Sequence, residues 1–134
     1  MEFEMLIVKP GEDLTEVEKI RKEIFGTGED DLDEIAINIV LKESGKAAAC
    51  GRLLLDMESD RLIIEQIGVA EEKRRQGIGT EVMRRLMDIA LENETEEVWA
   101  KTHSNEAVIE LLSKHGFDEL NKYWMSVDVP YYRP

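Results

Sequence analysis

Basic residues are scarce in this chain. It has 17 Lys and Arg against 30 Asp and Glu among 134 residues, so its formal net charge is −13. Binding DNA or RNA needs a broad basic face, and this balance argues against a nucleic-acid partner. Long apolar runs are also missing, and none approaches the roughly 20 residues that a membrane-spanning helix needs. The opening segment, Met1-Glu2-Phe3-Glu4, is acidic and is followed by a short apolar run, unlike a signal peptide.

Cysteine occurs once, at Cys50, so no internal disulfide is possible and a reducing, cytoplasmic location is expected. Cys50 stands between Ala49 and Gly51 without a catalytic motif, and we interpret it as a small core residue. Aromatic residues make up 6% of the chain, which predicts a mainly aliphatic core. We expect no bound metal.

One segment reverses the acidic trend. Residues 73–85, KRRQGIGTEVMRR, contain five basic residues and one acid, a local net charge of +4. An apolar run at 62–70 precedes it and predicts a strand, whereas Val82, Leu86, Ile89 and Ala90 follow at helical spacing. Glycines between a strand and a helix allow backbone N–H groups to approach a ligand, and the helix start favours anions. This pattern predicts a phosphate site, and the alternative is a tight turn with solvated arginines.

Two common phosphate-binding motifs are excluded. Val82 stands where the dinucleotide fingerprint G-x-G-x-x-G requires its third glycine. The loop G-x-x-x-x-G-K-[ST] does not occur in the sequence.

The remaining pattern predicts one mixed α/β domain over residues 1–134. Strands are expected at 3–8, 35–41, 47–56, 62–69, 97–101 and within 117–129. Helices are expected at 81–92 and 105–114, and a first helix, capped by Asp13 or Thr15, is expected to run to about Phe25. Short turns at 44–46 and 58–60 predict an antiparallel meander, with a second hairpin around 119–122. The strand–helix–strand unit from 62 to 101 should run parallel and right-handed. Ser104 is expected to cap the last helix.

The segment around the glycines resembles the signature Q/R-x-x-G-x-G/A of the GCN5-related N-acetyltransferase (GNAT) family, with Arg74, Gly77 and Gly79 at the fixed positions. Three further stretches, IRKEIF (20–25), CGRLLL (50–55) and WAKTHSNEAVIELLSKHGF (99–117), resemble other parts of that family. Within these stretches, the pieces IRKEIF, CGR and AKTH resemble the family's branch of uncharacterised bacterial and archaeal predicted acyltransferases. The resemblance implies the acyl-CoA N-acyltransferase fold, a mixed and mostly antiparallel sheet whose parallel central strands splay apart around the cofactor.

The resemblance also implies where acetyl-CoA would bind. Its diphosphate would lie on the loop made of Arg74, Arg75, Gln76, Gly77, Ile78, Gly79 and Thr80. A backbone amide among Ile67, Gly68 and Val69 would face the thioester carbonyl, and Gly68 marks an expected bulge there. Asn105 resembles the family asparagine that contacts the pantetheine arm.

The proton-transfer groups stay open at this point. Glu65, a carboxylate in an apolar strand, and His103, after the fifth strand, are both candidate general bases. The family often protonates the leaving thiolate with a tyrosine on the following helix, where this chain has Leu112. Tyr123 on the terminal strand pair, or a water, is the expected substitute.

We therefore expect an acetyl-CoA-dependent N-acetyltransferase that acts on a primary amine of a small cationic molecule or a peptide, by direct attack in a ternary complex. The alternatives are a CoA-binding sensor without turnover and an interaction protein with an acidic docking surface. The acidic run Glu29, Asp30, Asp31, Asp33 and Glu34 is interpreted either as a solvated segment or as the mouth for a cationic acceptor. A monomer and a homodimer both remain open.

Overall fold

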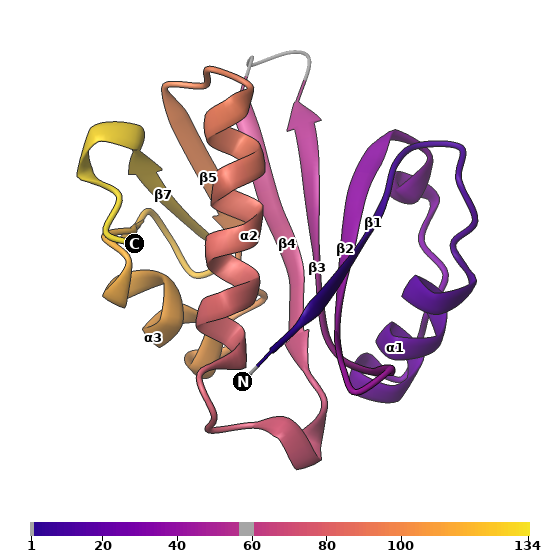
Figure 1. Cartoon of the computed structure of the whole chain (residues 1–134). Coiled ribbons are helices and arrows are strands. Elements are labelled where there is room, and N and C mark those ends of the chain that lie inside the picture. The colour runs from indigo at the N-terminus through magenta and orange to yellow at the C-terminus, as the bar shows by residue number, and fades with distance from the viewer. Residues whose placement is uncertain (1, 57–60) are drawn as a thin grey trace.

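The computed structural model describes residues 2–56 and 61–134 (Figure 1). Its strands form one sheet in the order β1-β2-β3-β4-β5-β7-β6. The strands are β1 (Glu4–Val8), β2 (Ala36–Glu43), β3 (Lys46–Asp56), β4 (Arg61–Val69), β5 (Glu97–Lys101), β6 (Asp118–Glu119) and β7 (Trp124–Asp128). The helices are α1 (Thr15–Phe25), α2 (Ile78–Glu92) and α3 (Glu106–Lys114), with short 3-10 turns η1 (Asp31–Ile35), η2 (Glu71–Lys73) and η3 (Val129–Tyr131).

The predicted topology is confirmed. Strands β2, β3 and β4 form the antiparallel meander, and β1 pairs antiparallel with β2 after the connection through α1 and η1. Strand β4 pairs in parallel with β5 after the crossover through α2. Parallel pairing requires such a crossover, whereas antiparallel neighbours need only short turns. The turn predicted at 58–60 lies outside the described residues.

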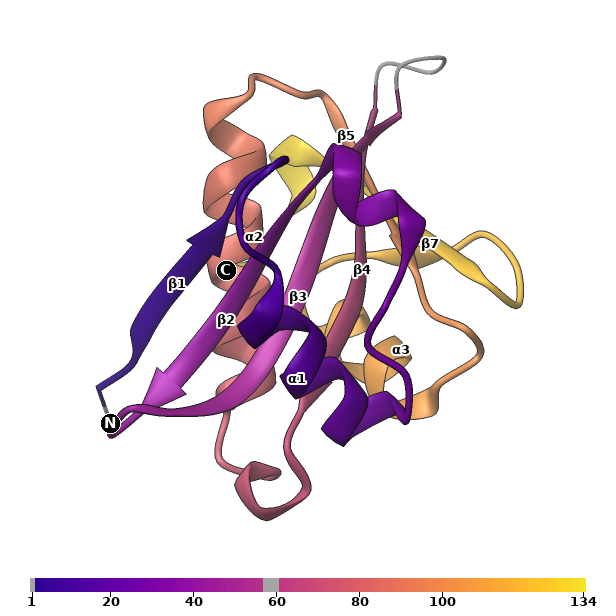
Figure 2. The same ribbon diagram turned by 90° about the vertical axis from the view of Figure 1, so that its right-hand side faces the viewer.

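The helices lie on both faces of the sheet (Figures 1 and 2). One face packs its aliphatic side chains against α2 and α3, with Met83, Met87 and Met125 in the core. The other face packs α1 against β2 and β3, where the buried Cys50 lies beside Val17 and Ile20. Burial raises the pKa of Cys50 to about 12, which fits a packing role rather than a nucleophile.

Three predicted helix starts are wrong, and all three errors concern caps. Helix α1 begins at Thr15 with Leu14 as its N-cap, not after a cap at Asp13 or Thr15. Helix α2 begins at Ile78, three residues before the predicted start, because Gly77 adopts a left-handed conformation (φ 80°) as its N-cap. Helix α3 is capped by Asn105, whose side-chain oxygen accepts hydrogen bonds from the backbone N–H of Ala107 and Val108. The predicted cap, Ser104, instead donates its hydroxyl to the carbonyl of Lys122, 18 residues away in sequence.

Candidate functional site

The central strands separate at one end of the sheet. Strands β4 and β5 pair only from Leu62 to Ile64 and from Val98 to Ala100. Beyond these pairs, starting at Glu65 and Lys101, the two strands no longer share a ladder. An opening between two parallel strands leaves backbone groups free for a ligand.

A bulge in β4 accompanies the separation. Cys50 pairs with Gly68 and Arg52 pairs with Glu65, so Gln66 and Ile67 together oppose Gly51, and Gln66 has φ 56°. The bulge expected at Gly68 is therefore centred one to two residues earlier. Gly51 has no space for a side chain, because a Cβ there would come within 2.7 Å of a methyl group of α2. The residue opposite the bulge is therefore packed directly against α2.

The glycine-containing loop borders a cavity of about 650 Å³. Its walls come from the β4 bulge, the loop, the first turn of α2 and one face of α3. They include these residues predicted for the cofactor: Ile67, Gly68, Val69, Arg74, Arg75, Gly77, Ile78, Gly79, Thr80 and Asn105. The remaining loop residue, Gln76, is exposed and is not part of the wall.

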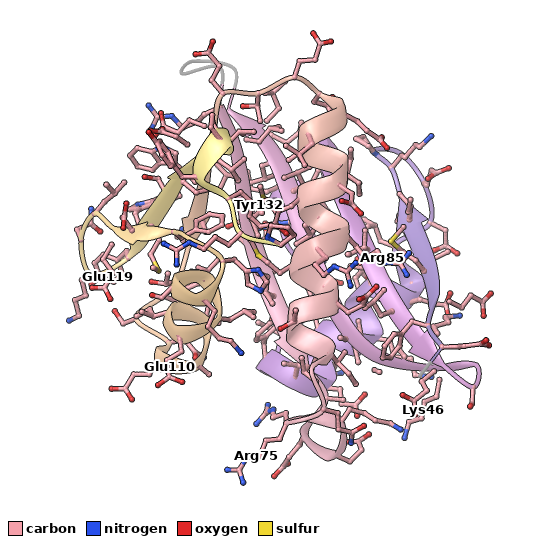
Figure 3. All side chains as sticks on the ribbon, turned by 60° about the vertical axis from the view of Figure 1, so that its left-hand side comes forward. Lys46, Arg75, Arg85, Glu110, Glu119 and Tyr132 are labelled. Atoms are coloured by element: carbon pink, nitrogen blue, oxygen red, sulfur yellow. The ribbon has the colours of Figure 1, made fainter. Side chains whose placement is uncertain are left out.

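The positive charge of the loop is smaller than the sequence indicates. Lys73 binds Glu43 at 3.0 Å, and Arg84 and Arg85 share Glu81 at 3.1 Å and 2.7 Å. Arg74 donates its Nε to the carbonyl of Val69 at 3.1 Å, which holds its guanidinium at the cavity. Arg75 projects outward from the loop, whereas Arg85 lies along α2 (Figure 3). Arg74 and Arg75 are thus the loop cations with no recorded carboxylate partner among the described residues.

A second cavity of about 280 Å³ continues the first into the opening between β4 and β5. The two cavities share Phe25, Ile67, Asn105 and Val108 as lining residues. The second one adds polar groups from the separated strand ends, namely Gln66, Lys101, Thr102 and His103. One cleft therefore runs from the glycine loop to the strand opening.

His103 is held over this cleft by an unusual backbone. His103 and Ser104 have φ of 50° and 60°, a conformation that costs energy in residues other than glycine. Three hydrogen bonds to the β6–β7 loop hold it: Thr102 N–H to the Tyr123 carbonyl at 2.8 Å, and the Thr102 and Ser104 hydroxyls to the Lys122 carbonyl. The Tyr123 side chain is 51% exposed and lines neither cavity.

Glu65 lies in a buried ionic network rather than on the cleft wall. Its Oε1 accepts from Arg52 Nε at 3.1 Å and from Arg52 Nη2 at 2.6 Å, and its side chain is nearly buried. Arg52 Nη1 also donates to Asp33 at 3.1 Å, and Asp33 accepts further bonds from Arg21 and Asn38. Burial opposes ionisation of Asp33, but these hydrogen bonds outweigh it and hold the pKa of its carboxyl below the usual value.

This network changes the interpretation of the acidic run. Asp33 is buried, and Asp30 caps η1 through the N–H of Leu32 and lies 3.3 Å from Arg52. Only Glu29, Asp31 and Glu34 are exposed. The run is therefore not a set of five solvated carboxylates, because two of them neutralise buried arginines.

The α3 position at which this chain has Leu112 in place of a tyrosine acid does not face the cleft. Leu112 is fully buried in the core, and α3 turns Ala107, Val108 and Leu111 toward the cleft. Among the described residues, α3 thus contributes no ionisable side chain to the cleft wall.

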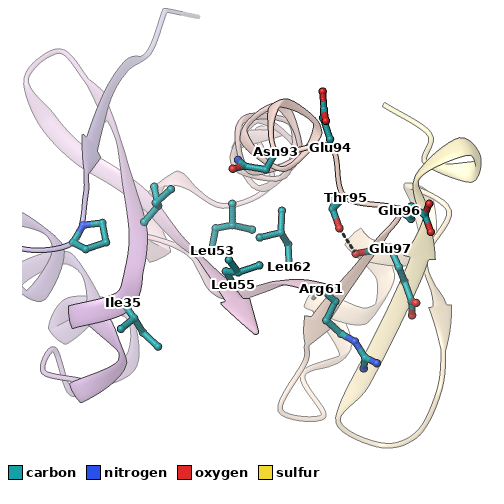
Figure 4. Close-up of a pocket in the computed structure, with 12 residues that line it drawn as sticks. Ile35, Leu53, Leu55, Arg61, Leu62, Asn93, Glu94, Thr95, Glu96 and Glu97 are labelled. Carbon is teal, nitrogen blue, oxygen red and sulfur yellow. Dashed lines mark hydrogen bonds between the residues drawn. The ribbon is translucent and has the colours of Figure 1, made fainter. Parts of the chain in front are cut away.

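Another cavity, of about 700 Å³, lies beyond the C-terminal end of α2 (Figure 4). Leu53, Leu55 and Leu62 lie at its centre, and Thr95 donates its hydroxyl to the carbonyl of Glu97 at the rim. The glycine loop and the strand opening contribute no residue to it, so we do not assign the chemistry there. In the described parts of the chain, no cluster of metal-ligating side chains forms, and no helix has the length and apolar character to cross a membrane.

Solved structures of similar fold are acyltransferases. The ribosomal-protein-S18-alanine N-acetyltransferase from Escherichia coli is 19% identical, with a TM-score of 0.77, and the match covers 96% of this chain and 94% of that chain. An acyl-CoA N-acyltransferase from Pseudomonas aeruginosa is 18% identical, with a TM-score of 0.75 over 93% and 99% of the two chains. A GNAT family acetyltransferase from Elizabethkingia anophelis, solved with acetyl-CoA bound, is 15% identical, with a TM-score of 0.74 over 94% and 97%.

Among curated proteins, no sequence matches this chain. The identities of the solved structures are low, so those similarities show the shared fold alone. The profile described as "Acetyltransferase (GNAT) family" matches residues 7–117. Because this match spans most of the domain, including the glycine loop and the strand opening, the chain belongs to the GNAT family of acetyltransferases.

Proposed function

We propose that this protein is an N-acetyltransferase that moves the acetyl group of acetyl-CoA to a primary amine by direct attack in a ternary complex. The observation that carries this proposal is the continuous cleft from the glycine loop to the opening between β4 and β5. A cleft of this kind can hold a long, phosphate-bearing thioester at one end and an amine at the other. Holding both reactants in place contributes up to about 7–11 kcal/mol to lowering the barrier.

The cofactor would be bound mainly by backbone groups. The N–H groups at the start of α2, with Arg74 and Arg75, would bind the diphosphate. The bulged residues 66–68 would offer N–H groups to the pantetheine arm and to the thioester carbonyl, whose oxygen gains charge during attack. Asn105 uses its side-chain oxygen as a helix cap, which leaves its amide NH₂ for the arm.

The reaction needs a neutral amine. Its nitrogen forms a bond to the acetyl carbon, the carbon–sulfur bond breaks, and the amine proton is removed while the CoA thiolate gains one. We assign His103 as the general base, because it lines the cleft and imidazole transfers protons near neutral pH. Glu65 is the second candidate, acting through an ordered water, because its Oε1 is engaged by Arg52. For the proton that the thiolate gains, the proposed donor is a water or Tyr123, whose exposed side chain would have to turn inward.

The acceptor is a small cationic amine or the amino group of a peptide. The net charge of −13 and the exposed Glu29, Asp31 and Glu34 favour the approach of ammonium groups. A second function, CoA binding without turnover, is favoured by one observation: the face of α3 at the cleft carries only apolar side chains.

Two measurements on the intact protein test these functions. Calorimetry with CoA is expected to give binding, and release of the CoA thiol over a panel of amines, with product masses, is expected to identify an acetylated amine. Binding without an acetylated product from any amine would favour the sensor. Absence of CoA binding to the folded protein would refute both functions.

A further inference from the structure

Lys101 lacks the kind of partner that comparable basic side chains have. Several half-buried or buried cations of the described structure face a carboxylate: Arg21 with Asp33, Lys42 with Glu16, Arg52 with Glu65, Lys73 with Glu43 and Arg85 with Glu81. Half-buried Arg61 stacks its guanidinium 4.0 Å from the centroid of the Trp99 ring. Lys101 is half-buried too, but it forms no ion pair among the described residues. Its Nζ lies 5.9 Å from the centroid of the Trp124 ring.

The position of Lys101 makes this absence informative. Lys101 follows the last β4–β5 pair, Ile64 with Ala100, and so stands at the start of the opening, across from Glu65. Glu65, the residue after the last paired position of β4, bonds Arg52 instead. The buried polar atoms without a hydrogen-bond partner among the described residues do not include Lys101 Nζ, so this ammonium is accessible to a ligand in the cleft. Because the chain has 30 acidic residues, a shortage of carboxylates does not explain why Lys101 has no carboxylate partner among the described residues.

The side chain of Lys101 belongs to the acceptor end of the cleft. Its neighbours Val98 and Ala100 pack into the core under α2, so Lys101 points to the opposite face, the one that carries α1. It lines the smaller cavity with Gln66 and His103, and it is absent from the wall of the larger cavity that contains the glycine loop. The cofactor phosphates, by contrast, would have Arg74 and Arg75.

We propose that Lys101 binds a carboxylate of the acceptor, so that the preferred acceptor carries a carboxylate close to its reactive amine. This inference rests on the proposed function and narrows its acceptor. The required chemistry is found in a free amino acid and in a peptide with an acidic residue next to its N-terminus. A lysine that lines the same cavity as the base would hold such a carboxylate while the amine faces the thioester.

Matched acceptors test the inference. One arm compares free amino acids with the corresponding amino acid amides, and the other compares peptides that have Asp or Asn as the second residue. Each is assayed by thiol release with the parent protein, Lys101→Gln, Lys101→Arg and Lys122→Gln. Lys122 is a suitable control, since it is an exposed lysine on the neighbouring β6–β7 loop and lines neither cavity.

In at least one arm, we expect the parent to prefer the carboxylate-bearing acceptor. Lys101→Gln should lower kcat/KM for that acceptor about tenfold to a hundredfold, the effect of one charge-assisted hydrogen bond, and spare its amide. Lys101→Arg should retain most of the preference, and Lys122→Gln should behave like the parent. The arm that responds tells a free amino acid from an acidic peptide.

Binding is measured in parallel by titrating each acceptor into the protein with and without CoA, so that the result does not depend on turnover. If carboxylate acceptors bind only when Lys101 is present but are not acetylated, the result would support this carboxylate site and refute acetyl transfer. An equal loss for acid and amide would place Lys101 at the thioester and overturn the inference. A parent protein that neither binds nor acetylates carboxylate acceptors better than amides would also overturn it.

Discussion

Asp33→Asn is the substitution whose effect the buried ionic network defines most sharply. The Oδ1 atom of Asp33 accepts from Arg21 at 3.0 Å, from Asn38 at 3.1 Å and from Arg52 at 3.1 Å. Asparagine keeps the shape but removes the charge, and its NH₂ would face guanidinium donors. Arg52 would retain the carboxylate of Glu65, whereas Arg21 would lose its carboxylate partner. The buried Nε of Arg21 already has no hydrogen-bond partner among the described residues.

The expected loss of stability is large. Removing one member of a buried ion pair typically costs about 3–5 kcal/mol, because the other charge stays buried. Domains of this size have total stabilities of about 5–15 kcal/mol. At about 2.1 cal/mol/K per residue, the 134 residues give an unfolding entropy near 0.28 kcal/mol/K, so Tm should fall by about 10–18 °C.

Urea and thermal unfolding followed by circular dichroism measure this change, with Asp31→Asn as the control. Asp31 belongs to the same acidic run and is exposed, so its substitution should alter stability by no more than about 0.5 kcal/mol. Because the folded pKa of Asp33 is lowered, its contribution is complete above the unfolded pKa of about 3.9 and is lost as the pH falls through the folded pKa. The two variants should therefore converge in strong acid. Equal Tm values for Asp33→Asn and Asp31→Asn at pH 7 would refute the reasoning.

Further substitutions probe the cleft. Gly79→Val should reduce CoA affinity, measured by calorimetry, more than tenfold, because the added methyl groups would project into the cavity. Its Tm should stay nearly unchanged, because a Cβ at this position meets its neighbours only at 3.4 Å and 3.8 Å. Changing Arg74 and Arg75 together to Gln should weaken CoA at least tenfold, and a smaller loss would mean that neither arginine contacts phosphate. His103→Ala should lower kcat about a hundredfold or more with unchanged CoA affinity, and an unaltered kcat would exclude it as the base. Cys50 should resist thiol reagents at pH 8 until the protein unfolds, as mass spectrometry after labelling would show, because burial raises its pKa to about 12.

The sequence by itself determined the order of the elements, the meander and the position of the glycine loop. These features follow from local patterns: the apolar period of strands and helices, short turns, and glycines at fixed spacing between a strand and a helix. The position of the loop between β4 and α2 was therefore predictable, and the residues predicted there, apart from the exposed Gln76, line the adjoining cavity. Their role in binding the cofactor stays a prediction. The start of α2 was not, since the sequence pattern does not reveal that Gly77 takes a left-handed conformation.

The tertiary structure alone decided which charges are free. Asp33 and Glu65 resemble solvated or catalytic carboxylates in the sequence, yet Arg21 and Arg52 reach them from α1 and β3. Conversely, Lys101 looks like an ordinary strand lysine until the register of β4 and β5 places it at the opening, opposite an acid that is already engaged. Such pairings join residues 12 to 36 positions apart. They depend on strand register and helix packing, and no local pattern encodes either.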